Sequence, residues 1–199
     1  MKNRINIIPI ISFLLFIIVF ILLKIGIIYT FDNYVYEQFI INDFLTSIMV
    51  FITFFGEAKT IFYITILLLL FLKKRKYKIM IVINSLIGLN VFHTLKIIIK
   101  RPRPTGINLV DVTGYSFPSG HTYMTIIFYG LLLYLINTNK EKIKCKNLLN
   151  IILVLIIITV PISRVYLGVH YASDTIAGFT LGLIHLFLFI SLAKNKKLL

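Results

Sequence analysis

Long apolar segments dominate this chain of 199 residues and leave few folds open to it. The first of them, from about Ile5 to Tyr29, has Lys24 as its only charged residue. About 20 apolar residues in a helix span the hydrocarbon core of a bilayer. A soluble core could not hide 59% hydrophobic residues in such runs, because a helix that is apolar all round has no face for water. We therefore expect an all-α, polytopic membrane helix bundle.

Apolar length predicts six transmembrane helices, and the chain is expected to form one membrane domain over residues 1–199. The first apolar segment lacks a small-residue cleavage site, so we expect it to stay as an anchor. The third helix should end near Lys100, because Pro102 and Pro104 forbid further helix. The six predicted spans cover approximately residues 5–29, 59–72, 79–100, 119–136, 148–162 and 172–192.

A shorter apolar run, Phe44 to Phe55, does not fit this count directly. It is too short to cross a bilayer comfortably, and Asp43 and Glu57 flank it. We interpret it as a short outer-surface or partly re-entrant helix. The alternative is that it joins the following segment in one long tilted helix, with Glu57 and Lys59 buried in protein.

Charge is distributed very unevenly, with 21 Lys and Arg against 7 Asp and Glu. Basic clusters at residues 1–4, 73–78, 140–146 and 194–197 lie just outside apolar segments, as in the cytoplasmic loops of membrane proteins. This placement argues for a bilayer and against nucleic acid as the partner. It predicts both termini in the cytoplasm. Cys145 is the only cysteine, which excludes an intramolecular disulfide and a cysteine-rich metal site.

Three short motifs carry the residues suited to chemistry. On the predicted topology all three lie at the outer ends of helices, at one membrane face, although the spans were drawn without them. The motifs are Lys96 with Arg103-Pro104, then Pro118-Ser119-Gly120-His121, and then Ser163-Arg164 followed by His170 and Asp174.

This set of residues is suited to phosphoryl transfer. The transition state spreads negative charge over three oxygens, which Lys96, Arg103 and Arg164 can neutralise. Ser119 is a good N-cap, and Gly120 allows the amides at a helix start to approach an anion.

Two histidines supply the reactive groups. His170 and Asp174 are four residues apart, either on one helix face or with His170 just outside the first turn, so that the carboxylate can fix the imidazole tautomer. His121 can act as general acid and base. His185 is expected to have a packing or hydrogen-bonding role, and Asp111 and Tyr115 are expected to lie in a solvated loop.

The order and spacing of these residues resemble the full signature of the type-2 phosphatidic acid phosphatase superfamily, over residues 96–174 and with no departure. The resemblance implies a six-helix membrane phosphatase without a cofactor or metal. It also implies that His170 forms a phosphohistidine with Asp174 as its partner and that His121 is the acid and base. The implied phosphate ligands are Lys96, Arg103, Ser119, Gly120 and Arg164.

The expected function is hydrolysis of a lipid phosphate or diphosphate on the extracytoplasmic side of the cell membrane. Undecaprenyl diphosphate is favoured as substrate, ahead of phosphatidic acid and phosphatidylglycerol phosphate. Two other classes stay open: a lipid phosphotransferase, and a non-catalytic anion-binding membrane protein or transporter. The second has no use for the His170 and Asp174 pair. Vanadate-dependent oxidation is disfavoured by the membrane spans.

Overall fold

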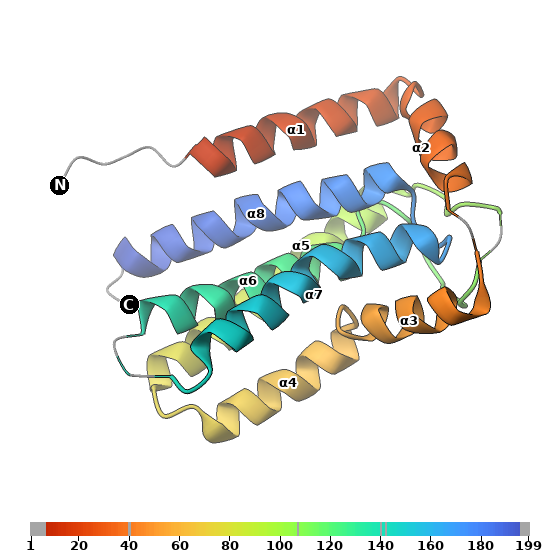
Figure 1. The fold of residues 1–199 in the computed structure, drawn as a ribbon. Helices are drawn as coiled ribbons and strands as arrows, with labels where there is room; N and C mark the ends of the chain where they lie inside the picture. Colours follow the sequence, from red (N-terminus) through yellow and green to blue (C-terminus); the bar gives the residue numbers. More distant parts are fainter. Residues whose placement is uncertain (1–6, 40, 107, 140, 142, 196–199) are drawn as a thin grey trace.

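The computed structural model describes residues 7–39, 41–106, 108–139, 141 and 143–195, and within these ranges the chain is helical with no strand. Figure 1 shows the helices as a bundle of roughly parallel and antiparallel rods. The predicted all-α class is confirmed. The helices are α1 (Ile7–Lys24), α2 (Ile28–Glu37), α3 (Asp43–Phe54), α4 (Ala58–Phe71), α5 (Arg75–Ile99), α6 (Gly120–Thr138), α7 (Lys146–Tyr166) and α8 (Ala172–Asn195).

Four helices, α1, α5, α7 and α8, are each long and apolar enough to cross a membrane, and the bent pair of α3 and α4 could provide a fifth crossing. Helix α6 has 19 residues but is more polar. It lies inside the bundle in contact with α5, α7 and α8, where it needs no lipid-facing surface. The six-span count therefore stays a prediction, while a multi-pass arrangement is supported.

The first predicted span is divided in two. Helix α1 ends at Lys24, and Gly26 follows with a φ of +82°, a backbone conformation that side chains rarely adopt. The chain then turns into α2, which packs on α8. Ile28 and Tyr29 therefore belong to a separate helix, and Asp32 on that helix is almost completely buried.

The uncertain segment Phe44–Phe55 forms α3, which packs along α7. Asn42 caps α3 by accepting a hydrogen bond from the Leu45 N–H at 2.8 Å. Helices α3 and α4 meet at an angle of 50° around Gly56 and Glu57, and they follow each other along the bundle in Figure 1. The segment is neither continuous with the next helix nor isolated at the surface, because a break separates two helices that both pack on the bundle.

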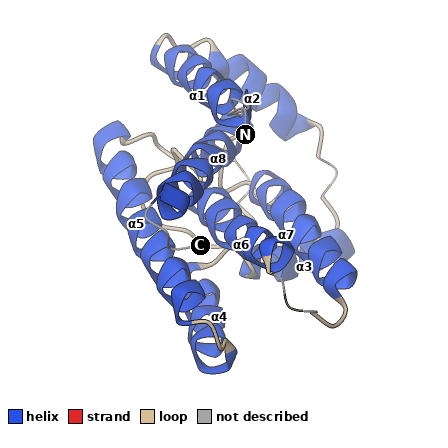
Figure 2. Cartoon of the chain, turned by 90° about the vertical axis from the view of Figure 1, so that its left-hand side faces the viewer, coloured by secondary structure: helices blue, strands red, loops and turns tan. Residues whose placement is uncertain are grey.

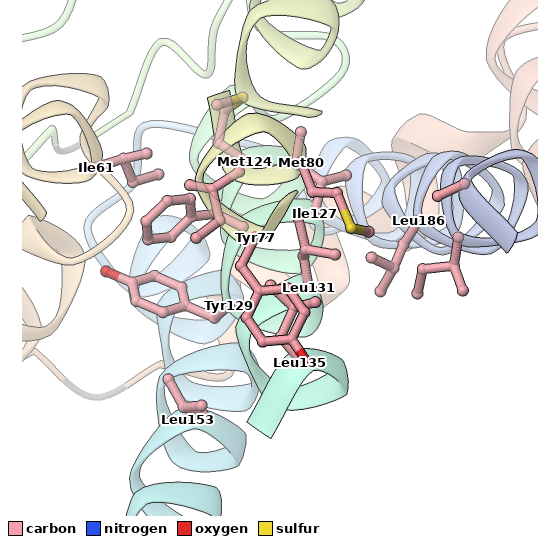
Figure 3. Close-up of a cluster of buried hydrophobic side chains, with 14 of the residues drawn as sticks. Ile61, Tyr77, Met80, Met124, Ile127, Tyr129, Leu131, Leu135, Leu153 and Leu186 are labelled. Atoms are coloured by element: carbon pink, nitrogen blue, oxygen red, sulfur yellow. The ribbon is translucent and has the colours of Figure 1, made fainter. Parts of the chain in front are cut away.

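The core is built around α6. Its inward side chains meet residues of α4, α5, α7 and α8 in one buried hydrophobic cluster, which includes Tyr77, Met80, Ile127 and Leu131 (Figure 3). Large apolar side chains elsewhere, especially on α1 and α4, are exposed at the surface of the bundle. Such an outer surface suits a hydrocarbon environment, in which exposed Leu, Ile and Phe have no hydration cost.

The two ends of the bundle differ. The start of α1 and the end of α8 lie at one end, and the turn between α7 and α8 lies at the other (Figure 1). Lys74 contacts Glu141 at 3.1 Å, so the α4–α5 and α6–α7 connections meet at one end as well. Of the predicted basic clusters, Lys2, Arg4, Lys140, Lys142, Lys196 and Lys197 lie outside the described residues.

Helices α6 and α8 come unusually close at the end that carries the motifs. A Cβ atom at Gly178 of α8 would lie 2.6 Å from the carbonyl oxygen of Ser119, which caps α6. The Ser119 N–H in turn donates to the carbonyl oxygen of Asp174 at 3.0 Å. The missing side chain at Gly178 therefore allows the start of α6 to pack directly on the start of α8.

Candidate active site

The three motifs meet at one cavity of about 540 Å³, at the end of the bundle where α6 and α8 begin. Helices α5, α6 and α7, the 100–119 loop and the α7–α8 turn all contribute to its wall. Of the predicted site residues, the cavity is lined by Lys96, Arg103, Gly120, His121, Arg164 and His170. Ser119 and Asp174 are fully buried and lie behind this lining.

Lys96, Arg103 and Arg164, hereafter the cavity cations, hydrogen-bond to uncharged oxygens. The Lys96 ammonium donates to the carbonyl oxygen of Tyr115 at 2.5 Å. The Arg103 guanidinium donates to three carbonyl oxygens, those of Thr113, Gly114 and Val169, at 2.7–3.0 Å. Among the described residues no carboxylate forms a salt bridge with a cavity cation. Their positive charge is therefore available to an anion.

Arg164 is held by a helix that the motifs do not include. Its Nη1 donates to the Thr53 hydroxyl of α3 at 2.6 Å, and its Nε has no partner among the described residues. The side chain is only 2% exposed although it lines the cavity. A buried guanidinium with unused donors is a binding group for phosphate oxygens.

His170 lies in the α7–α8 turn, just outside the first turn of α8. Its Nε2 lies 3.3 Å from Nη1 of Arg103, so this nitrogen faces the cationic wall. Burial and the charges of the cavity cations lower the pKa of the His170 imidazole well below its usual range. The ring is therefore neutral near pH 7 and has one nitrogen with a free lone pair, as a nucleophile requires.

The other nitrogen of His170 does not reach Asp174 directly. Nδ1 lies 3.7 Å from the nearest Asp174 oxygen, beyond hydrogen-bond distance, but 3.3 Å from the Ser116 hydroxyl. Ser116 also hydrogen-bonds to Asp174 Oδ2. The expected direct pairing of imidazole and carboxylate is thus replaced by an arrangement with a serine between them.

A second carboxylate and a second arginine hold Asp174. Arg101 donates from Nη1 to Asp174 and from Nη2 to Asp32, both at 2.6 Å. The Arg101 guanidinium lies 4.1 Å from the ring centre of Tyr171, and all three charged side chains are at most 1% exposed. Burial alone would lower the pKa of Arg101, but Asp174 and Asp32 raise it. This network links α2 to the start of α8.

The start of α6 presents two backbone amides to the cavity. Ser119 is the N-cap, and its hydroxyl accepts from the Thr122 N–H at 3.5 Å. The N–H groups of Gly120 and His121 form no hydrogen bond within the described part of the chain. Free amides at a helix N-terminus favour a bound anion. Ser119 supports this arrangement as a cap, from outside the cavity lining.

The remaining polar candidates divide between the cavity and the bundle. Asp111, Tyr115 and His93 line the cavity, and His93 stacks on Phe92 with 4.5 Å between ring centres. His185 lies elsewhere, with its Nδ1 at 2.5 Å from the Tyr123 hydroxyl, which agrees with the hydrogen-bonding role expected for it. Over the described ranges, no three His, Cys, Asp or Glu side chains are grouped as a metal site would require.

Sequence reasoning missed the residues that support the site: Asp32, Thr53, Arg101 and Ser116. Two of them carried a signal. Arg101 is a second Arg-Pro pair inside the first motif, and Ser116 stands two residues before Pro118. Asp32 and Thr53 carried none, because they lie far from the motifs in the chain and only the fold brings them close.

Comparison with known proteins places this geometry among similar ones. A family model described as the PAP2 superfamily matches residues 78–198. Phosphatidylglycerophosphatase B of Bacillus subtilis (strain 168) is 41% identical over 95 residues, which cover 47% of this chain and 47% of that protein. Undecaprenyl-diphosphatase of Sulfolobus acidocaldarius is 32% identical over 146 residues, 69% of this chain and 66% of that protein. The matches thus span about half of the first relative and just under two thirds of the second.

Two solved structures have a similar fold. The first transmembrane PAP2-type phosphatidylglycerolphosphate phosphatase from Bacillus subtilis superposes with a TM-score of 0.86 and 28% identity, over 96% of this chain and 98% of that one. Aquifex aeolicus LpxE superposes with a TM-score of 0.65 and 21% identity, over 82% of this chain and 94% of that one. The second likeness concerns the fold alone.

Proposed function

Because the chain belongs to the PAP2 superfamily, we propose that it is a membrane lipid phosphatase that works through a phosphohistidine at His170. The substrate is a lipid phosphate monoester or diphosphate, and the product is inorganic phosphate. No metal or cofactor takes part. The named relatives are phosphatases, and the roles of individual residues follow from the geometry described above.

One observation carries the proposal. The neutral imidazole of His170 faces a cavity walled by three cations that no carboxylate neutralises. A bound phosphate would replace carbonyl and hydroxyl contacts with charge-assisted hydrogen bonds, which are roughly twice as strong as neutral ones. The same cations would stabilise the oxygens of the phosphoryl group during transfer.

In the first step His170 Nε2 attacks phosphorus. The N–P bond forms while the P–O bond to the leaving group breaks, and the leaving oxygen takes a proton from His121. The leaving group is the lipid alcohol of a monoester or the lipid phosphate of a diphosphate. The resulting phosphoimidazole keeps its proton on Nδ1 and carries a positive charge, which the Ser116 and Asp174 side stabilises.

In the second step water attacks the phosphohistidine. His121, now neutral, takes a proton from this water as the O–P bond forms and the N–P bond breaks. Inorganic phosphate leaves, and both histidines return to their initial protonation states. The cavity lies at the end of the bundle away from the ends of α1 and α8, and we assign that end to the extracytoplasmic face.

The position of the cavity at the end of the bundle suits an amphiphilic substrate, because the phosphate can enter the cationic site while the lipid chain stays among the apolar helices. Phosphatidylglycerol phosphate and undecaprenyl diphosphate are the substrates to test first. Each corresponds to the named activity of one relative, and phosphatidic acid completes the panel.

The test is phosphate release from this panel in detergent, with excess chelator, by the wild type and by His170→Ala. We expect release by the wild type with and without chelator, and loss of at least a thousandfold in the variant. His185→Gln is the matched control, because His185 is another partly buried histidine outside the cavity. Loss on chelation would refute the metal-free mechanism, and unchanged release by His170→Ala would refute the nucleophile.

A trapping experiment separates the other classes. Brief reaction with ³²P-labelled substrate followed by alkaline denaturation should leave an acid-labile label on the wild type and none on His170→Ala. Transfer of the label to an added lipid alcohol in preference to water would identify a phosphotransferase. Binding of substrate without any label or release would indicate an anion-binding protein.

A further inference from the structure

Ser116 lies between the two groups that are expected to pair. Its hydroxyl is 3.3 Å from His170 Nδ1 and hydrogen-bonds to Asp174 Oδ2, and the residue is completely buried. The Ser116 N–H donates to the carbonyl oxygen of Arg101 at 2.8 Å, which fixes its backbone. No water is needed to complete this chain of three groups, since each is within reach of the next.

The hydrogen-bond roles in the chain follow from the acceptors. Arg101 and the Tyr171 N–H, at 2.6 and 2.9 Å, keep Asp174 ionised and acceptor-only. The Ser116 hydroxyl therefore donates to Asp174, and its oxygen lone pairs face His170. The only group that can use these lone pairs is a proton on Nδ1, which leaves the proton off Nε2.

We propose that Ser116 is a positioning residue that sets the tautomer of His170, by accepting from Nδ1–H and passing the influence of Asp174 to the ring. Asp174 then acts through Ser116 and not by direct contact. The kinetic part of this inference rests on the proposed function, while the tautomer itself does not.

Two surrounding features support a role specific to Ser116. The Arg103 guanidinium has donors only, so its 3.3 Å approach to Nε2 is favourable when Nε2 carries a lone pair and unfavourable when it carries a proton. Asp174 cannot replace Ser116 without moving, because 3.7 Å is too long for a hydrogen bond and Arg101 holds the other carboxylate oxygen.

The direct test is ¹⁵N NMR of the histidine-labelled protein in detergent, near pH 7. The chain has four histidines, so a spectrum of His170→Gln identifies the signals of His170 by difference. We expect wild-type His170 to be protonated at Nδ1 and unprotonated at Nε2. Ser116→Ala should give a mixture of tautomers or a shift to the Nε2–H form, and Ser116→Thr, which keeps the hydroxyl, should restore the wild-type pattern.

Kinetics of lipid phosphate hydrolysis provide the second measurement. Ser116→Ala should lower kcat by ten- to hundredfold with little change in KM, because the phosphate ligands are untouched, and Ser116→Thr should recover most of the loss. Ser85→Ala is the matched control: Ser85 is a buried serine of α5 whose hydroxyl has no partner among the described residues, so its removal should change neither readout.

The outcomes separate the two proposals. A wild-type His170 protonated at Nε2, or an unchanged tautomer in folded Ser116→Ala, would overturn the role of Ser116 whatever the activity. If Ser116→Ala does not fold, the wild-type tautomer still decides. The expected tautomer in a protein that releases no phosphate from any substrate would leave the positioning role in place and refute the proposed function.

Discussion

Removal of the Thr53 hydroxyl tests whether α3 has a catalytic role through Arg164. Thr53 is 5% exposed and accepts from Arg164 Nη1 at 2.6 Å, and Arg164 Nε has no partner within the described ranges. Thr53→Val keeps the branched shape and removes this acceptor. The guanidinium would then lose its one fixed contact and sample orientations that do not face the cavity.

The size of the effect follows from the type of bond. A hydrogen bond to a charged group contributes about 1.5–3 kcal/mol, and each 1.4 kcal/mol corresponds to a factor of ten in an equilibrium or rate ratio. The loss in kcat/KM should therefore lie between about tenfold and a hundredfold. We expect the lower value, because α7 still holds the Arg164 backbone in place. The assay is initial-rate phosphate release from a lipid phosphate in detergent.

Thr46→Val provides the matched control. Thr46 lies on the same helix, and its hydroxyl bonds to the Tyr166 hydroxyl of α7 at 3.1 Å, so both variants remove one hydrogen bond between α3 and α7. Only Thr53 contacts a charged group of the cavity. Thr46→Val should lower the melting temperature slightly and leave kcat/KM within about twofold of the wild type. Equal kinetic losses in the two variants would refute the positioning of Arg164 by Thr53.

Three further predictions concern the site and its support. Asp32→Asn removes one of the two carboxylates that bind buried Arg101 and should destabilise the protein by about 3 kcal/mol, a fall of about 6–12 °C in melting temperature; an unchanged melting temperature would contradict the role of the pair. The lowered pKa of His170 keeps the imidazole neutral in mild acid, so the acid limb of the kcat/KM profile should lie below pH of about 6.5, the usual histidine pKa; a limb above that value would show a protonated or unburied His170. Gly178→Ala places a Cβ atom 2.6 Å from the Ser119 carbonyl oxygen, which should separate α8 from the start of α6 and reduce activity more than tenfold, as measured by phosphate release; wild-type activity would show that the two helices can part without harm.

The helices could be predicted where apolar length and breakers agree. Proline at 102 ends α5 at Ile99, and the Ser119 cap begins α6, both within a residue of the prediction. The break after Lys24 was not predicted, because Gly26 lies within an otherwise unbroken apolar run. The bend between α3 and α4 was also missed: local sequence indicates that a helix can end at Gly56 but not how its two halves pack.

The site shows the same division. Motif spacing brought together the residues that line the cavity, because each motif stands at a helix end on the same side of the bundle. The supporting contacts depend on tertiary packing, since Asp32 and Thr53 are more than 60 residues distant in sequence from the arginines they hold, as the separations of 69 and 111 residues show. Only Ser116 and Arg101 were close enough to a motif for their positions to be noticed.

The arrangement of charge explains why both groups of residues are needed. Asp174 must be ionised to orient the nucleophile through Ser116, but a free carboxylate beside the cavity would repel phosphate and neutralise its ligands. Arg101 resolves this conflict, because it takes up the charge of Asp174 on the side away from the cavity and is itself balanced by Asp32. The cavity cations then keep carbonyl and hydroxyl partners and their full charge. Helix α2, which contains no motif, therefore contributes to phosphate binding by supplying the carboxylate that holds Arg101 in place.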